Sequence, residues 1–292
     1  MNSTDNLQSG TSGDALPSRV LGRTGKEVSI LGLGGEGILR THGETAKAVQ
    51  VIHRALDLGI TYCDTAPAYA SSRDYYGAAL SERRQRVFLA SKTHDRSCDG
   101  SLRLLDDSLL RLRTDHLDLW QLHDLRTADD LDRIFAKGGA IEALVRAREE
   151  GRVRFLGLTG HHDPDILVEA MRRFAFDTVL VALNAADVHR LSFIHKVLPE
   201  AISRSIGVIG MKVCAQGRLL GKGGITMEDA MGYVLSLPAV TTIIVGCRTP
   251  DEVEDNVRIV RQFKSFGEER MRALEKQTST LAAAFTYYKM QL

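Results

Sequence analysis

The sequence predicts an α/β fold with one domain: a (β/α)8 TIM barrel, preceded by a short hairpin and followed by an extra C-terminal helix. First, apolar runs and helical patterns alternate with a period of about thirty residues, as βα repeats should. Second, the runs are almost continuously apolar, which is typical of parallel strands covered on both faces. Third, 292 residues suffice for a single barrel of this kind.

The N-terminal end is expected to contribute little to this fold. Residues 1–15 are rich in Ser, Thr, Gly and Asn and nearly lack apolar residues. This composition predicts a disordered leader, followed by a barrel domain at 16–292. The next segment, SRVLGRTGKEVSILGLGG, places a Thr-Gly turn between two short apolar runs. This pattern predicts a hairpin that leads into the first barrel strand.

The remaining elements follow in order along the chain. We expect strands at 60–64, 87–92, 117–123, 152–160, 178–184, 206–212 and 241–246, and helices at 44–58, 72–80, 100–112, 140–150, 164–173, 191–198 and 227–237. Gly151 is the expected C-terminal cap of the helix before it. The segment between 124 and 139 is predicted to be a polar connection. The segment 268–292 is predicted to be helix, packed outside the barrel or over its mouth.

Composition limits the classes of partner. With 38 basic and 37 acidic residues the net charge is +1, so no broad basic field for nucleic acid or an anionic membrane is expected. No apolar run approaches a membrane span, and the polar opening lacks a signal-peptide core. We therefore expect a cytoplasmic protein with a small-molecule substrate, and the oligomeric state stays open. Four scattered cysteines predict reduced thiols and no zinc framework: Cys63, Cys98, Cys214 and Cys247.

Glycines crowd the first strand. GLGGEG, from Gly32 to Gly37, matches the GxGxxG pattern of dinucleotide-binding folds. A Rossmann unit opens its helix at the third glycine, whereas here six residues intervene before the helical pattern. The favoured interpretation is a barrel-rim segment where the backbone at Gly35 approaches a ligand closely.

Ionisable side chains end three successive strand-like runs, and this pattern predicts an active site. The runs end at Asp64, Lys92 and His123, and Tyr69 follows Asp64 in the stretch DTAPAY. In a parallel barrel the strand C-termini meet at one face, which brings the four residues together. A nearby lysine lowers the high pKa of a phenol, Asp64 holds the lysine, and His123 can hydrogen-bond a carbonyl oxygen. Such a group suits protonation of an oxygen as a hydride reaches the carbonyl carbon.

These residues resemble the catalytic tetrad of the aldo-keto reductase superfamily. DTAPAY is similar to that family's DTA-x-x-Y element, LASK to its lysine strand and LWQLH to its histidine strand. EGRVRFLGLTG and IIVGCRTPDEVEDNV are similar to later family segments, so the resemblance covers roughly 18–263. It implies an NADPH-dependent carbonyl reductase or alcohol dehydrogenase with Tyr69 as general acid and the nicotinamide across the barrel mouth.

The resemblance also implies a cofactor site, with departures from the family pattern. Thr159 and Gly160 replace Ser-Asn, Asn184 stands where many members have glutamine, and Met211 or Lys212 replaces a stacking tyrosine. Near the end, Glu252 replaces a phosphate-binding arginine, yet NADP(H) is still favoured over NAD(H) because Arg248 can bind the 2′-phosphate. The implied cofactor contacts are Gly35, Thr159, Asn184, Met211, Lys212, Gly217, Gly246, Arg248, Glu252 and the adenine-contacting Asn256.

Several residues have competing structural interpretations. Cys63 is expected to be a small buried side chain, and Trp120 is expected to pack in the wall of the barrel. T-P-x-E at 249–252 is a capping box, so Glu252 can serve the helix start alone. His161 and His162 can bind substrate or metal, but no carboxylate stands at ligand spacing, so we expect them to face solvent and predict no metal site.

Rival functions remain open. One is a regulatory subunit or redox sensor that binds NADP(H) with little turnover. Another is a metal-dependent barrel hydrolase, although the first strand has no His-x-His pair. Lys212 as a Schiff-base nucleophile is a third. Substrate-lining residues are expected from loops and the tail, with Phe193, Tyr287 and Tyr288 as candidates.

Overall fold

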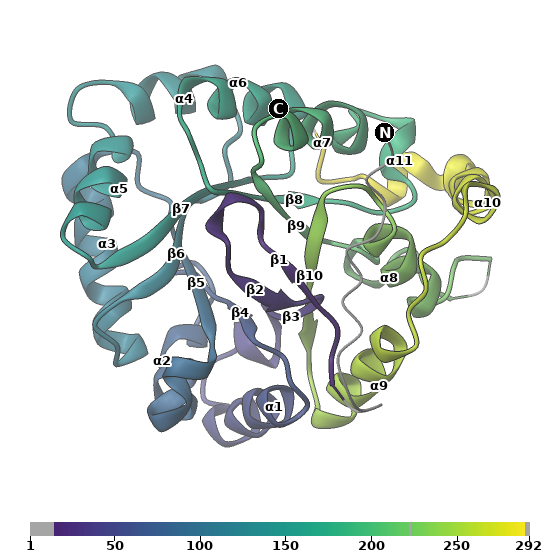
Figure 1. Cartoon of the computed structure of the whole chain (residues 1–292), viewed down its shortest axis with the longest axis horizontal. Helices are drawn as coiled ribbons and strands as arrows, with labels where there is room; N and C mark the ends of the chain where they lie inside the picture. The colour runs from purple at the N-terminus through teal and green to yellow at the C-terminus, as the bar shows by residue number, and fades with distance from the viewer. Residues whose placement is uncertain (1–14, 222, 290–292) are drawn as a thin grey trace.

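Eight parallel strands close into a barrel in a computed structural model of the chain, which describes residues 15–221 and 223–289 (Figure 1). The predicted (β/α)8 barrel is confirmed, with each strand beside its neighbours in chain order and the last beside the first. Residues 1–14 of the predicted leader lie outside the described residues. The barrel strands are β3 (Leu31–Gly37), β4 (Tyr62–Asp64), β5 (Phe88–Thr93), β6 (Leu117–Leu122), β7 (Val153–Gly160), β8 (Thr178–Ala182), β9 (Gly207–Met211) and β10 (Val240–Cys247).

Helices surround the barrel on its outer side (Figure 1). They are α1 (Thr45–Asp57), α2 (Ser72–Leu80), α3 (Cys98–Leu112), α4 (Ala128–Phe135), α5 (Ala140–Glu149), α6 (Pro164–Arg173), α7 (Phe193–Ser203), α8 (Met227–Leu235), α9 (Pro250–Arg261), α10 (Glu268–Thr278) and α11 (Ala282–Phe285). The glycines of GLGGEG lie within β3, and α1 begins well after them, so the Rossmann interpretation is wrong. Within the described ranges, no helix has the length and apolar character needed to cross a membrane.

The predicted hairpin is present and plugs one end of the barrel. Strands β1 (Ser18–Val20) and β2 (Glu27–Ser29) pair antiparallel. Leu21 and Val28 pack into a cluster with Tyr62 and other side chains of the barrel interior. A Cβ on Gly207, at the start of β9, would lie 2.8 Å from the Leu21 side chain. The hairpin therefore covers the end where the strands begin, and the opposite end is left for a ligand.

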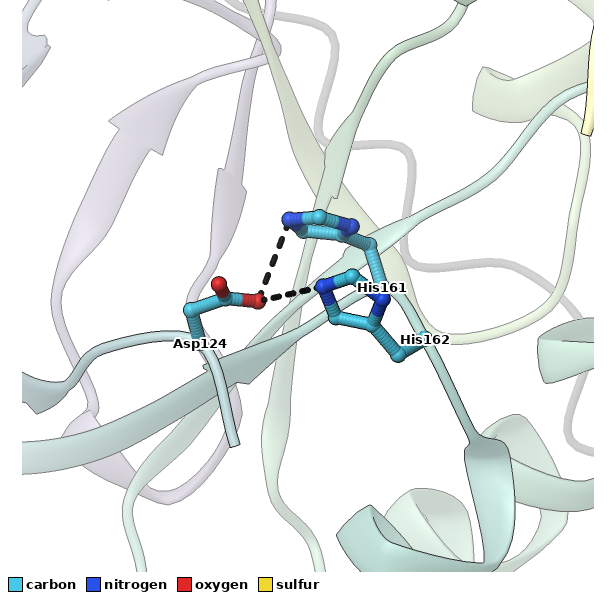
Figure 2. A group of neighbouring side chains, drawn as sticks. All are labelled: Asp124, His161 and His162. Carbon is cyan, nitrogen blue, oxygen red and sulfur yellow. Dashed lines mark ion pairs between the residues drawn. The ribbon is translucent and has the colours of Figure 1, made fainter. Parts of the chain in front are cut away.

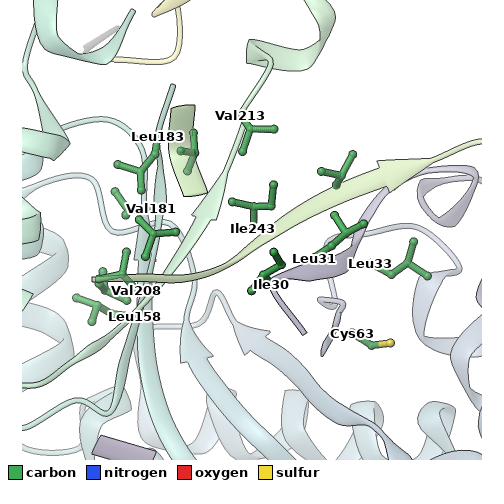
Figure 3. Close-up of a cluster of buried hydrophobic side chains, with 14 of the residues drawn as sticks. Ile30, Leu31, Leu33, Cys63, Leu158, Val181, Leu183, Val208, Val213 and Ile243 are labelled. Atoms are coloured by element: carbon green, nitrogen blue, oxygen red, sulfur yellow. The ribbon is translucent and has the colours of Figure 1, made fainter. Parts of the chain in front are cut away.

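The larger apolar core lies between the strands and the helices. Leu89 belongs to this core, whereas Phe88 and Ala90 belong to the interior cluster, as alternation along a strand requires. Trp120 is fully buried in the larger core, as predicted for barrel-wall packing, and Cys63 is buried there too (Figure 3).

One helix was missed in the sequence. The segment predicted to be merely polar contains α4, which begins after Thr127, whose hydroxyl accepts a hydrogen bond from the N–H of Asp130. Only Leu131 and Ile134 are buried on this helix. Leu131, Ile134 and the partly buried Phe135 have helical spacing, but the helix is only eight residues long and lies in a mostly charged segment.

Candidate active site

The structure brings the four predicted catalytic side chains to one cavity. Asp64, Tyr69, Lys92 and His123 all line a cavity of about 470 Å³ at the end of the barrel where the strands finish. The strands that carry them are adjacent, with β4 paired to β5 and β5 to β6. The expected convergence at the carboxyl ends of parallel strands is thus observed.

A buried ion pair forms the base of the site. Lys92 Nζ lies 2.6 Å from Asp64 Oδ2 and also donates to the carbonyl oxygen of Thr65 at 2.9 Å. Lys92 stands two residues beyond Ala90, an interior residue of the same strand, so its side chain points into the barrel. Burial lowers the pKa of Lys92, and the Asp64 carboxylate opposes that shift. The pair therefore holds two charges in a site with almost no access to water.

Tyr69 lies above this pair. Lys92 Nζ is 4.7 Å from the centroid of the Tyr69 ring, and the ring meets that of His123 edge to face with centroids 5.7 Å apart. Burial, followed by the carboxylates of Asp64 and Glu36, raises the pKa of the Tyr69 phenol well above its usual range. The phenol therefore keeps its proton in this structure, and the expectation that the charge of Lys92 lowers its pKa stays a prediction.

His123 is neutral at physiological pH. Burial, and next the positive charge of Lys92, lower the pKa of its imidazole to about 3. The backbone N–H of His123 donates to the carbonyl oxygen of Thr93 at 2.8 Å, and the backbone carbonyl oxygen of His123 accepts from Arg96 at 2.9 Å. The backbone is therefore held on both sides, and the neutral ring has one N–H to offer to a ligand.

Most of the predicted cofactor contacts line the same cavity. They are Gly35, Thr159, Met211, Lys212, Gly217, Gly246, Arg248 and Glu252. Two others do not line it. Asn184 is fully buried and donates to the carbonyl oxygen of Lys212 and to the hydroxyl of Tyr288, while Asn256 donates to Cys247 Sγ at 3.4 Å. Both amides bond to protein groups in this structure, and their predicted contacts with a cofactor stay predictions.

The predicted capping box at the start of α9 is only half formed. The hydroxyl of Thr249 accepts from the N–H of Glu252, as expected. The Glu252 carboxylate, however, accepts from the N–H of Arg248 at 2.6 Å instead of returning to Thr249. Glu252 therefore serves the helix start and lines the cavity at once, so its two interpretations do not exclude each other.

The C-terminal tail reaches the mouth of the barrel. Tyr287 and Tyr288 line a second cavity of about 530 Å³ that shares Tyr69 and His123 with the first. Lys289, fully buried, pairs with Asp187. Phe193 is wrong as a lining residue, because it is fully buried with its ring 5.2 Å from Lys289 Nζ. The tail thus covers the mouth through its tyrosines, one of the two placements expected.

A further group was missed in the sequence. His161 and His162 do not face solvent: their side chains are 21% and 17% exposed and both approach Asp124 (Figure 2). Burial raises the pKa of the Asp124 carboxyl, but His162, His161 and Arg126 more than offset this and hold it below its usual range. The carboxylate that sequence spacing did not supply comes from the loop after a different strand.

The chain is similar to known proteins in both sequence and fold. The model of the aldo/keto reductase family matches residues 30–229. L-galactose dehydrogenase from Arabidopsis thaliana is 28% identical, with 85% of this chain and 89% of that protein aligned. Pyridoxal 4-dehydrogenase from Microbacterium luteolum is 26% identical over 83% and 92%. The holo form of an aldo-keto reductase from Bacillus halodurans superposes with a TM-score of 0.77 at 26% identity, covering 90% of this chain and 96% of that one.

Proposed function

Since the chain belongs to the aldo/keto reductase family and is an oxidoreductase, we propose that it reduces an aldehyde or ketone with NADPH, or oxidises the corresponding alcohol with NADP⁺. Tyr69 is the general acid of the reduction and the general base of the reverse reaction. The observation that carries this proposal is the cavity in which Tyr69 and His123 lie above the buried Lys92–Asp64 pair.

The cavity residues fit a nicotinamide cofactor. The cavity extends from Tyr69 and His123 to Arg248 at the start of α9, where a helix N-terminus and a guanidinium favour a phosphate group. Lys212 adds a second cation to the wall, and Gly217, with nothing within 4 Å of a Cβ placed on it, leaves its backbone open to a ligand. When bound, the nicotinamide supplies or accepts the hydride.

The side chains of this protein then handle the oxygen of the substrate. Because the phenol of Tyr69 keeps its proton, it can donate that proton to a carbonyl oxygen as negative charge develops there. The neutral His123 ring can donate a second hydrogen bond to the same oxygen. In the reverse reaction the Lys92 ammonium, near the ring, stabilises the phenolate that accepts the proton.

The test of this function is turnover by the purified full-length protein. Aldehydes and ketones are offered with NADPH, and L-galactose and pyridoxal with NADP⁺, because relatives are named for acting on these two compounds. Consumption of the reduced cofactor, or its formation, supports the proposal. Cofactor binding without turnover on any compound would favour a redox sensor or regulatory subunit instead, and absence of cofactor binding would overturn both.

Cofactor preference depends on Arg248. We expect Arg248→Ala to weaken NADPH binding by about 10–100-fold, since a charge-assisted bond to phosphate contributes about 1.5–3 kcal/mol. NADH binding should change less than about two-fold, because NADH has no 2′-phosphate. Calorimetric titration with each cofactor measures both effects, and Arg258→Ala, on the helix α9 that follows Arg248, is the control. A wild-type preference for NADH would contradict this role and make Glu252 the deciding charge.

Gly35 positions Tyr69. A Cβ at this position would lie 2.3 Å from Tyr69 Cδ2 and 3.1 Å from the carbonyl oxygen of Asp64, so the ring has to move. We expect Gly35→Ala to lower kcat by about 100-fold, the loss typical of a displacement of about 1 Å. Gly267→Ala, with nothing within 4 Å of the new methyl group, is the matched control and should keep full activity. Wild-type kcat in Gly35→Ala would show that the ring position is not critical.

A further inference from the structure

Asp124, His161 and His162 form a cluster that the proposed reaction does not use. Asp124 follows β6, and the two histidines follow β7, its neighbour in the barrel. The Nε2 atoms of His161 and His162 lie 3.1 Å and 3.4 Å from the same carboxylate oxygen, Asp124 Oδ1, and both rings point toward it (Figure 2). Three potential ligand atoms thus converge from two loops.

Asp124 is held in place by hydrogen bonds that do not involve its Oδ1 atom. The backbone N–H of Asp124 donates to Thr159 Oγ1 at 2.9 Å, and the backbone carbonyl oxygen of Asp124 accepts from Arg96 at 3.0 Å. Oδ2, the other carboxylate oxygen, accepts two bonds from Arg126 at 2.6 Å and 2.8 Å. Oδ1 is therefore the oxygen left to bind something else, and its position is set by groups outside the cluster.

Hydrogen bonding inside the cluster does not account for the arrangement. Among the described residues, Asp124 Oδ1 and His162 Nε2 are both inaccessible to solvent and have no hydrogen-bond partner of acceptable geometry. A buried carboxylate oxygen without a partner is costly, and such atoms are uncommon in folded proteins. An ion between the three atoms would satisfy them together.

The spacing suits a metal ion. Ligand atoms bound tetrahedrally at about 2.0–2.1 Å lie about 3.3 Å from one another, which matches the two measured distances. One ligand atom from each of the three residues lies within 4.8 Å of those of the other two. Two imidazole nitrogens and one carboxylate oxygen are a ligand set suited to divalent first-row transition metals, and less to Mg²⁺ or Ca²⁺.

We propose that Asp124 Oδ1, His161 Nε2 and His162 Nε2 bind one divalent transition-metal ion, for which Zn²⁺ is the reference. The site lies beside Tyr69 and His123 at the mouth of the barrel. Asp124 and His161 line the second cavity together with Tyr69 and His123, and His161 also lines the first. Arg126 fixes the carboxylate from outside, as outer partners do in metal sites.

Calorimetric titration of the metal-free full-length protein with Zn²⁺ tests the proposal. We expect one saturable site per chain. Asp124→Asn, His161→Gln and His162→Gln should each weaken binding by more than about 100-fold, because loss of a direct ligand exceeds the 10–100-fold cost of losing an outer partner. Asparagine tolerates the left-handed backbone at position 124, where φ is 56°, so that variant should fold.

Controls separate this site from adventitious binding. His195→Gln removes an exposed histidine on α7 and should leave Zn²⁺ affinity unchanged. Circular dichroism and thermal unfolding of each apo variant check that the fold is retained. In the wild type, Co²⁺ should give the visible absorption bands of a low-coordinate site, and these should be absent in His162→Gln. Absence of a one-to-one site, or unchanged affinity in both Asp124→Asn and His162→Gln, overturns the proposal.

Discussion

Replacing Tyr69 with phenylalanine is expected to lower kcat for carbonyl reduction by about 10²–10⁴-fold, the usual contribution of a general acid. The ring of Tyr69 lies 4.7 Å from Lys92 Nζ, and Phe keeps the ring that packs against Gly35 and His123. NADPH affinity should therefore stay within about two-fold of the wild type. Steady-state kinetics and calorimetric titration of the same preparation measure the two quantities separately.

A matched control exists in the same cavity. Tyr287→Phe also removes one phenol hydroxyl, but from the C-terminal tail, where this hydroxyl bonds to Gln216. We expect it to change KM more than kcat, because the tail covers the cavity and does not supply the proton. Full activity in Tyr69→Phe would falsify the acid–base role, whatever the control shows.

Lys92→Met is expected to lower the free energy of unfolding by about 3–5 kcal/mol, the cost of leaving a buried charge without its partner. Lys92 and Asp64 have 1% and 0% of their side chains exposed, so water cannot replace the lost contact. The midpoint of urea unfolding should fall, with an unchanged dependence on urea concentration. Turnover should fall as well, because the phenolate of Tyr69 loses its neighbouring cation.

The double variant separates the structural role of the pair from its chemical role. Adding Asp64→Asn to Lys92→Met removes the unpaired charge, so stability should recover most of the loss. Turnover should stay low, because the cation near Tyr69 is still missing. Equal stability of the single and double variants would show that the charge of Asp64 does not cause the loss.

The fold and the core of the site were predictable because both follow local rules. Asp64, Lys92 and His123 end apolar runs on strands that are consecutive in the chain, and consecutive βα units place their strands side by side. The helix from Ser72 to Leu80 and the helix from Pro164 to Arg173 occur at the expected residues. Helix α4 was missed although its apolar residues have helical spacing, because it spans only eight residues of a mostly charged segment.

Side-chain pairings between loops were not predictable. The carboxylate that faces His161 and His162 stands 37 residues before His161, and no periodicity relates them. The partner of Lys289 is Asp187, and Asn184 bonds to Tyr288 of the tail instead of facing the cavity. In each case the deciding event is the docking of one loop or the tail against another, which depends on side-chain packing across the barrel mouth.

The sequence by itself determined the barrel, the order of its strands and the chemical types of the four side chains at their ends, since hydrophobic periodicity and βα connectivity are written along the chain. Only the tertiary structure decided the protonation of those side chains and the placement of His161 and His162 beside Asp124. Tyr69 keeps its proton because the folded barrel removes water from around it, and burial is a property of the whole packed structure.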